Sequence, residues 1–280
     1  MNYQVMEPIL QVRDVSLSFD GKPVLKNANA EIRNIVRPGV DQGQVVCLLG
    51  PSGVGKTQLF RILAGLQPLQ TAKDDPVQVS GQVLVSPELK PVKAGMVGVV
   101  SQHYTLFRHR TVMGNLLLAT SQAGMKEEEG KAKAMEYLKK FGIGDKARAY
   151  PAELSGGQRQ RVAIVQQLLC SNHFLLMDEP FSGLDPLMKD EACKLILDVS
   201  MLDELNTSVI TTHDISTAIV VADTIWLIGR DRDEKGNSVG ARIQKVYDLA
   251  AMGLAWDPDI RNKPEFAQLS REIRKDFANL

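Results

Sequence analysis

Residues 45–66 read VVCLLGPSGVGKTQLFRILAGL, and this stretch decides the fold. The apolar run 45–49 is short enough to be a strand that is buried on both faces. Beyond Lys56, apolar residues recur at helical spacing across 59–66, which predicts a helix. The sequence therefore predicts a buried strand, a glycine-rich loop and a helix in direct succession.

The loop that joins these two elements carries a phosphate-binding pattern. It reads Gly50-Pro51-Ser52-Gly53-Val54-Gly55-Lys56-Thr57 and matches G-x-x-x-x-G-K-[ST]. Glycines let the backbone turn its N–H groups toward phosphates, and the helix N-terminus adds partial positive charge. We expect Lys56 to neutralise the β- and γ-phosphates and the Thr57 hydroxyl to bind Mg²⁺. A chance glycine loop is the alternative, but the flanking strand and helix favour a nucleoside triphosphate site.

Two further strands end in polar residues that suit this chemistry. The buried run 174–177 leads into Asp178 and Glu179, at a sheet edge where α/β proteins bind ligands. Asp178 is expected to hold Mg²⁺, and Glu179 to activate the attacking water; an acidic loop that caps the strand is the alternative. His213 follows the apolar run 208–212 and could donate to the γ-phosphate, although a lone histidine is more often structural.

The composition limits the class of protein. The chain has 280 residues, 44% of them hydrophobic and 24% charged, as in globular proteins, and its length corresponds to about two domains. Lys plus Arg and Asp plus Glu each number 33, so the net charge is zero and no direct nucleic-acid partner is expected. Three scattered cysteines favour a reducing compartment. Without a signal-peptide pattern or a long apolar run, any membrane span is expected from another polypeptide.

The remaining pattern places these motifs in an α/β chain. Alternating residues 9–32, interrupted by the turn-rich stretch 20–23, predict an antiparallel N-terminal hairpin. Other expected elements are strands near 81–85, 96–100, 208–212 and 224–229, a helical region at 112–141, and an amphipathic helix within the polar tail 241–280. The alternation of strands with helices predicts a mixed, mainly parallel sheet.

The segment Leu154-Ser155-Gly156-Gly157-Gln158-Arg159-Gln160-Arg161 resembles the LSGGQ signature of ATP-binding cassette (ABC) ATPases. The resemblance runs from about Leu10 to Arg230, and the other motifs follow in the family's order. It implies a P-loop NTPase core with an N-terminal antiparallel β subdomain and an inserted α-helical signature subdomain. The implied ATPase domain covers 9–240, with its core at about 9–101 and 165–240, the helical subdomain at about 102–164, and a helical tail at 241–280.

The resemblance also implies roles for single residues. The implied ATP contacts are Phe19, stacked on adenine, and Gly50, Pro51, Ser52, Gly53, Val54, Gly55, Lys56, Thr57 and Gln58. The implied Mg²⁺ contacts are Thr57, Gln102 and Asp178, the catalytic residues are Glu179 and His213, and the coupling residues are Gln102 and Asp185. Because the family's cassettes pair head to tail, Ser155, Gly156, Gly157 and Gln158 would bind the γ-phosphate held by a second cassette.

Three positions depart from the residues that are commoner in this family. Gln58 replaces a second hydroxyl residue, which leaves the α-phosphate contact open, and Phe19 replaces a tyrosine. Gln166 lies where the signature helix usually carries an arginine, so the polar contact of that arginine is also open. None of the three removes a residue required for hydrolysis, and an active ATPase that uses ATP and Mg²⁺ is expected.

The segments around the signature favour a transporter subunit. A single cassette without a long heptad insert argues against the translation-factor and DNA-repair classes. Residues 103–116 and 150–153 resemble importer cassettes, and 264–273 weakly resembles cassettes for nitrate, sulfonate and taurine uptake.

The resemblance also implies partners and a location. A second ABC subunit, identical or related, and integral-membrane permease subunits are the implied partners, with or without a substrate-binding protein. The chain would then be cytoplasmic and peripheral on the inner face of the plasma membrane. The alternatives are a soluble ABC ATPase that drives a protein or nucleic-acid complex, and a scaffold that binds ATP without turnover, which Glu179 and His213 disfavour.

Overall fold

The computed structural model describes residues 3–40, 42–69, 71, 75–86, 88–171, 174–202 and 206–280. Its N-terminal segment forms β1 (Gln4–Phe19) and β2 (Lys22–Val36), which pair antiparallel as the alternating pattern predicts. β4 (Val77–Val85) pairs antiparallel with β1, and the short β5 (Lys90–Pro91) pairs with β4. The expected strand 81–85 is therefore the second half of a longer strand.

The second half of the sheet is parallel and carries the glycine loop. β3 (Gln44–Leu49) lies between β8 (Thr207–Thr212) and β9 (Thr224–Arg232), and all three run parallel. β7 (Phe174–Asp178) continues the parallel order beyond β8, and β6 (Gly98–Val100) forms the edge. Every residue of β3 is buried, as expected for a strand covered on both faces.

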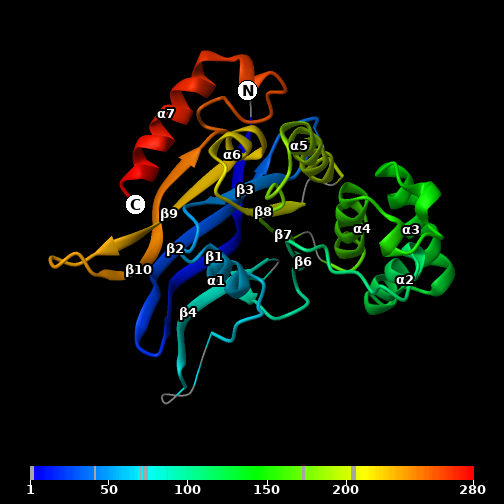
Figure 1. Cartoon of the computed structure of the whole chain (residues 1–280), viewed down its shortest axis with the longest axis horizontal. Helices are drawn as coiled ribbons and strands as arrows, with labels where there is room; N and C mark the ends of the chain where they lie inside the picture. Colours follow the sequence, from blue (N-terminus) through cyan, green and yellow to red (C-terminus); the bar gives the residue numbers. More distant parts are fainter. Residues whose placement is uncertain are drawn as a thin grey trace.

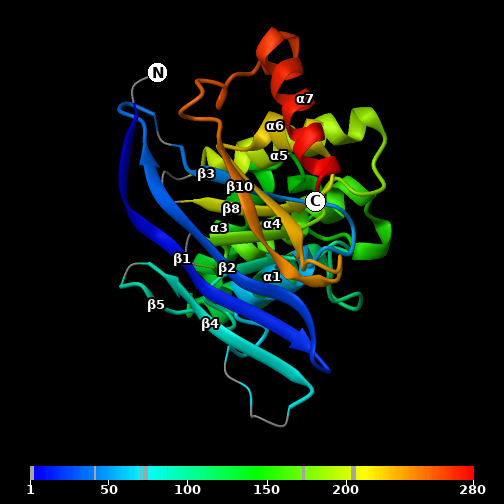
Figure 2. The ribbon, with the colours of Figure 1, turned by 90° about the vertical axis from the view of Figure 1, so that its left-hand side faces the viewer.

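Within the described residues, the two halves form one continuous sheet of ten strands. β10 (Ser238–Asp248) pairs antiparallel with β9 and meets β2 in parallel through one residue pair, Ala241 opposite Leu25. The strand order is β5-β4-β1-β2-β10-β9-β3-β8-β7-β6, and Figure 2 shows the strong curl of this sheet. The mixed α/β fold is confirmed.

Seven α-helices of the described chain accompany the sheet. The core helices are α1 (Lys56–Leu63), α5 (Pro186–Ser200), α6 (Ile215–Val221) and α7 (Pro264–Ala278). The helices α2 (Val112–Gln122), α3 (Glu127–Lys140) and α4 (Gly156–Leu168) form a group that projects to one side of the sheet (Figure 1). None of the described helices is long and apolar enough to span a bilayer.

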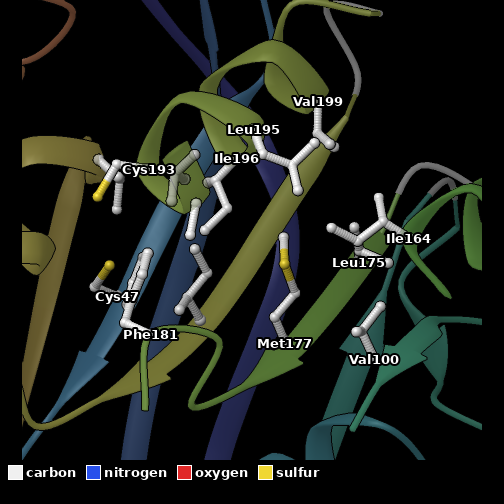
Figure 3. Packing of buried hydrophobic residues seen from close by; sticks show 14 of the residues in the cluster. Cys47, Val100, Ile164, Leu175, Met177, Phe181, Cys193, Leu195, Ile196 and Val199 are labelled. Atoms are coloured by element: carbon white, nitrogen blue, oxygen red, sulfur yellow. The ribbon is translucent and has the colours of Figure 1, made fainter. Parts of the chain in front are cut away.

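Two hydrophobic cores lie on the two faces of the parallel strands. Alternate residues of β3 point in opposite directions, so Val46 and Leu48 pack with α1 and the antiparallel strands, whereas Cys47 packs on the other face. Figure 3 shows this second core, in which Cys193 and Ile196 of α5 lie over the strands. The glycine loop is thus fixed by packing on both sides of the strand that precedes it.

Several expected boundaries differ from the structure. Residues 241–248 continue β10, so the tail expected at 241–280 is not helical throughout, and its α-helix starts only at Pro264. Helix α4 runs across the expected subdomain boundary at 164 and ends at Leu168. Helix α1 ends at Leu63 rather than Leu66, because the chain turns at Gly65, where φ is +67°. The strand expected at 96–100 is shortened to Gly98–Val100.

Candidate functional site

The glycine loop leaves the carboxyl end of β3 and leads directly into α1, as the sequence predicts. Gly53 and Gly55 adopt φ values of +77° and +122°, which residues with a side chain rarely adopt. A Cβ atom on Gly55 would also lie 3.2 Å from the Leu25 side chain of β2. Glycine is therefore needed at position 55 for both its backbone angle and its close approach to β2.

Lys56 is buried beneath this loop, with only 6% of its side chain exposed. Its Nζ donates to the carbonyl oxygens of Gly50 and Pro51 at 2.8 and 3.1 Å. The same ammonium lies 3.4 Å from Oε1 of Glu179, which follows β7. The loop lysine and the candidate catalytic carboxylate, far apart in the sequence, are thus neighbours.

The pairing of β7 with β8 sets the carboxylates in place. Asp178 lies opposite Thr211, and the Thr211 hydroxyl donates to Asp178 Oδ1 at 2.6 Å. The Glu179 N–H in turn lies 3.0 Å from the same hydroxyl oxygen and 3.2 Å from the Thr211 carbonyl oxygen. One threonine therefore contacts both acidic residues.

His213 completes this cluster from the end of β8. Its Nδ1 lies 2.9 Å from Oε2 of Glu179, so the two carboxylate oxygens of Glu179 face His213 and Lys56 respectively. The His213 side chain is 51% exposed, whereas that of Glu179 is 17% exposed. The arrangement places the carboxylate of Glu179 between an ammonium and an imidazole, beside the glycine loop.

The remaining candidates around the loop occupy accessible positions. Thr57 is exposed and Gln58 half-buried in the first turn of α1, and Phe19 is half-buried at the end of β1. Gln102 is exposed in the turn that follows β6, the strand next to β7. Asp185 is exposed and caps α5, where its Oδ1 accepts the Met188 N–H at 3.0 Å.

The signature residues form the start of α4. The Ser155 hydroxyl accepts the Gln158 N–H at 3.2 Å, and the Gln158 side chain accepts the Ser155 N–H at 3.0 Å, which is a capping box. A Cβ atom on Gly156 or Gly157 would meet nothing within 4 Å, so the helix start is open. In the described part of the chain, Ser155 has no hydrogen bond to the Lys56, Glu179 and His213 cluster.

Three polar contacts are not evident from the sequence. The sequence does not single out Thr211, because it lies within an apolar strand. Only the register of β7 with β8 brings it next to Asp178. Arg230 Nη2 donates to the Gly53 carbonyl at 2.5 Å, across 177 residues of sequence. Gln166, whose contact was open, donates from Nε2 to the Asn115 carbonyl at 3.3 Å. The signature helix is thus joined to α2 without the usual arginine.

The oxygen donors beside the loop fit a magnesium ion. Mg²⁺ prefers oxygen ligands and keeps several waters, so one carboxylate and one hydroxyl beside phosphates make a suitable set. Asp178 provides the carboxylate, held by Thr211, and Thr57 provides an exposed hydroxyl in the first turn of α1. The residues present therefore match the chemistry that the ion requires.

Comparisons with known proteins point to one family. The ABC transporter family profile matches residues 34–182. The glutamine transport ATP-binding protein GlnQ of Geobacillus stearothermophilus is 39% identical over 214 residues, which cover 75% of this chain and 82% of that protein. The sulfate/thiosulfate import ATP-binding protein CysA of Pseudomonas aeruginosa is 36% identical over 86% of this chain and 69% of its own length.

Two further likenesses extend over nearly the whole chain. The methionine import ATP-binding protein MetN 2 of Rhodococcus jostii is 32% identical over 97% of this chain and 78% of its own length. The structure of cbiO1 from Clostridium perfringens, part of the ABC transporter complex cbiONQ, superposes with a TM-score of 0.70 at 24% identity. That superposition covers 96% of this chain and 99% of cbiO1, and it supports the fold. With the loop, the acidic strand end and the signature in place, the chain belongs to the ABC transporter family, as an ATP-binding ATPase subunit.

Proposed function

We propose that this chain hydrolyses MgATP in a head-to-tail pair of cassettes and thereby drives an importer-type transporter. The observation that carries the proposal is the position of Glu179, 3.4 Å from the loop lysine Lys56 and 2.9 Å from His213. A carboxylate at the end of a parallel strand, beside a phosphate loop, is well placed to activate the water that attacks a γ-phosphate.

The residues of the cluster divide the chemistry among them. Lys56, when it turns from Glu179 toward the β- and γ-phosphates, leaves that carboxylate free to accept a proton from water. His213 is exposed enough to reach the γ-phosphate, and the loop N–H groups hold the other phosphates. Thr57, Asp178 and Gln102 would hold Mg²⁺, which neutralises charge on the β- and γ-phosphate oxygens when bound.

Exposure of the signature supports a site shared between two chains. Ser155, Gly156 and Gly157 start a helix whose N–H groups can bind an anion, and no atom of the described chain crowds the two glycines. Phe19 at the end of β1 is expected to stack on adenine. Asp185, at the start of α5, would link the two nucleotide sites after closure.

The names of the relatives support a proposal on partners. GlnQ is named for transport of glutamine, CysA for import of sulfate or thiosulfate, and MetN 2 for import of methionine, at comparable identity to this chain. Because ATP-binding subunits for such different solutes are similar to one another, we infer that other subunits select the solute. We therefore propose integral-membrane permease subunits as partners, reached from the cytoplasmic face of the membrane through the Gln102 region, with a substrate-binding protein outside.

Turnover by three purified proteins tests the ATPase site. The wild type should release phosphate from MgATP, whereas Glu179→Gln should bind ATP with unchanged affinity, lose at least ~100-fold in turnover and accumulate as a dimer. Lys56→Ala should instead lose tight ATP binding. Phosphate release, a binding titration and light scattering after size exclusion measure these three properties. Rapid turnover by Glu179→Gln would refute the role of that carboxylate.

Co-purification tests the transporter assignment separately. The tagged chain, extracted from membranes in mild detergent, should bring down a multi-span protein. If only soluble proteins co-purify, with and without ATP, the non-transport ABC ATPase becomes the better assignment.

A further inference from the structure

An ion pair joins α5 to the segment that carries His213. Lys189 lies in the first turns of α5, and its Nζ lies 2.6 Å from Oδ2 of Asp214, the residue after His213. The two side chains are only 32% and 23% exposed. Such a partly buried, charge-assisted hydrogen bond is stronger than an ion pair on an open surface.

Asp214 already has a structural task, because it caps α6. Its Oδ1 accepts the Thr217 N–H at 3.1 Å, and its own N–H donates to the Thr212 hydroxyl at 3.0 Å. One carboxylate oxygen therefore holds the start of α6, and the other is left for Lys189. Burial alone would raise the pKa of Asp214, but the hydrogen bonds from Lys189 and the Thr217 N–H lower it overall.

The His213 side chain has little packing of its own. It is 51% exposed, and Glu179 Oε2 is its hydrogen-bond partner within the described chain. Its position must then be set by the backbone on either side, which is the end of β8 and the cap of α6. A shift of the cap would move the imidazole relative to the phosphate loop, and small misplacements of a reacting group cost large factors in rate.

The backbone of Lys189 is part of the first turn of α5. The Lys189 N–H donates to the Asp185 carbonyl at 2.9 Å, the bond that closes the first turn of this helix. Asp185 caps the same turn through its side chain. The ion pair thus connects the exposed start of α5, where a second cassette is expected to arrive, with the residue next to His213.

We propose that Lys189 is a positioning residue for His213, acting through Asp214. The inference rests on the proposed roles of Glu179 and His213 in hydrolysis. Lys189 touches none of the reacting groups; it holds the junction between β8 and α6 so that the imidazole stays within reach of Glu179 and the γ-phosphate.

Three substitutions separate this role from general stability. Lys189→Met removes the ammonium but keeps most of the aliphatic side chain, and Lys189→Arg keeps a cation. Asp214→Asn removes the charge but keeps an oxygen that can cap α6. Lys194→Met is the matched control, because Lys194 lies exposed on the same helix and has no ion-pair partner among the described residues.

The first measurement is MgATP turnover against ATP affinity. Lys189→Met and Asp214→Asn should each lower kcat about tenfold with ATP affinity changed less than about twofold, since no group of the phosphate loop is touched. Lys189→Arg and Lys194→Met should stay within about twofold of the wild type. Turnover by Lys189→Met within about twofold of the wild type would overturn the proposal.

The second measurement needs no turnover and reads His213 directly. The chain has four histidines, so the imidazole signal that disappears in His213→Gln identifies His213 in proton NMR spectra. That signal should move in Lys189→Met and Asp214→Asn without nucleotide, and stay in place in Lys194→Met. An unmoved signal overturns the proposal, even where turnover falls.

The two measurements also distinguish which proposal fails. If the wild type releases no phosphate, the ATPase assignment of the site fails, while the NMR signal still decides whether Lys189 positions His213. Thermal unfolding shows whether Lys189→Met is folded. If it is not, the turnover and the NMR signal of Asp214→Asn test the proposal in its place.

Discussion

Glu179 adopts a left-handed backbone conformation, with φ at +48°. For a residue with a side chain, this conformation costs about 1–2 kcal/mol and persists only where neighbours hold it. Here the Glu179 N–H is held by the hydroxyl and the carbonyl oxygens of Thr211. The sharp turn directs the carboxylate back toward Lys56 instead of along the strand.

Thr211→Val tests this support, because valine has nearly the shape of threonine but lacks the hydroxyl. Asp178 loses a donor and the Glu179 N–H loses an acceptor, each worth about 1 kcal/mol. We expect kcat for MgATP to fall roughly tenfold, with stability lowered by no more than ~2 kcal/mol. Thr211→Ser keeps the hydroxyl and should stay close to the wild type. Phosphate release and thermal unfolding measure the two effects; equal turnover in both variants contradicts the role.

Asp223 is a buried carboxylate that directly precedes β9. Its Oδ2 accepts the Val45 N–H at 2.5 Å, which fixes the start of β3. Desolvation by burial raises the pKa of Asp223 from 3.8 to about 7, and the negative charge of Asp248 adds to this, while the Val45 N–H and Arg37 oppose it. The group therefore titrates near neutral pH in the folded chain.

The raised pKa of Asp223 makes the stability of the folded chain depend on pH. Between about pH 4 and about pH 7 the folded chain holds a proton on Asp223 that the unfolded chain has lost, so stability falls as pH rises through this window. From about pH 5 to about pH 7.5 the wild type should lose more than ~1 kcal/mol relative to Asp223→Asn, which keeps an acceptor for Val45. Urea unfolding at the two pH values measures this, and parallel losses in both proteins contradict it.

Single residues of the site differ in how far the sequence predicts them. Lys56 and Thr57 are set by local order because they start the helix after the glycine loop, and Asp178 and Glu179 because they lie at the end of β7. Thr211 and Lys189 could not be identified in this way. Their contacts depend on the register of β7 with β8 and on the packing of α5 beside α6, which local patterns do not encode.

The C-terminal helix α7 is part of the core rather than an appendage. Its apolar face packs on α6, and Leu269 and Ile273 are buried there. Its other side is tied to β10, where Lys245 lies 2.9 Å from Glu272 and 2.7 Å from Asp276. These exposed ion pairs contribute little each, so the buried face should carry most of the stability.

Ile273→Ala measures the contribution of that face. Ile273 is 0% exposed, and its truncation leaves a cavity between α7 and the rest of the core. We expect the free energy of unfolding to fall by about 2–4 kcal/mol. Val246→Ala is the control, because Val246 in β10 is 52% exposed and its loss should change stability by less than about 0.5 kcal/mol. Similar losses in the two variants would show that α7 does not belong to the cooperative unit.

The strands differ in how clearly the sequence predicts them. Strongly apolar runs such as β3 and β7 are evident in the sequence because both faces of each strand are covered. β10 was missed, since only its inner face is buried and a bulge between Ile243 and Lys245 breaks its alternation. The signal that could have found it is the alternation of Ala241 and Ile243 with the polar residues Arg242 and Gln244.

The assembled transporter is expected to cover a surface that one chain leaves open. Leu187 is 78% exposed and Met188 38% exposed at the start of α5, next to Asp185. Apolar side chains at such a position are the kind of surface that a second cassette would bury on closure.

Leu187→Glu should therefore block pairing without harming the single chain. In the Glu179→Gln background, ATP should no longer produce a dimer, because a charge replaces the apolar contact, while ATP affinity of the monomer stays within about threefold. Met201→Glu is the control, since Met201 is 58% exposed at the opposite end of the same helix. Light scattering with ATP distinguishes the outcomes, and a full dimer in the Leu187→Glu variant contradicts this use of the surface.

β10 and β2 join the parallel and antiparallel halves of the sheet, and residues of both halves share one hydrophobic core. Phe19 belongs to the antiparallel half, whereas Lys56 follows a strand of the parallel half. If Phe19 stacks on adenine while the glycine loop holds the phosphates, the bound nucleotide would bridge both halves of the sheet. Part of the free energy of ATP binding would then stiffen the single subunit, before a second subunit binds.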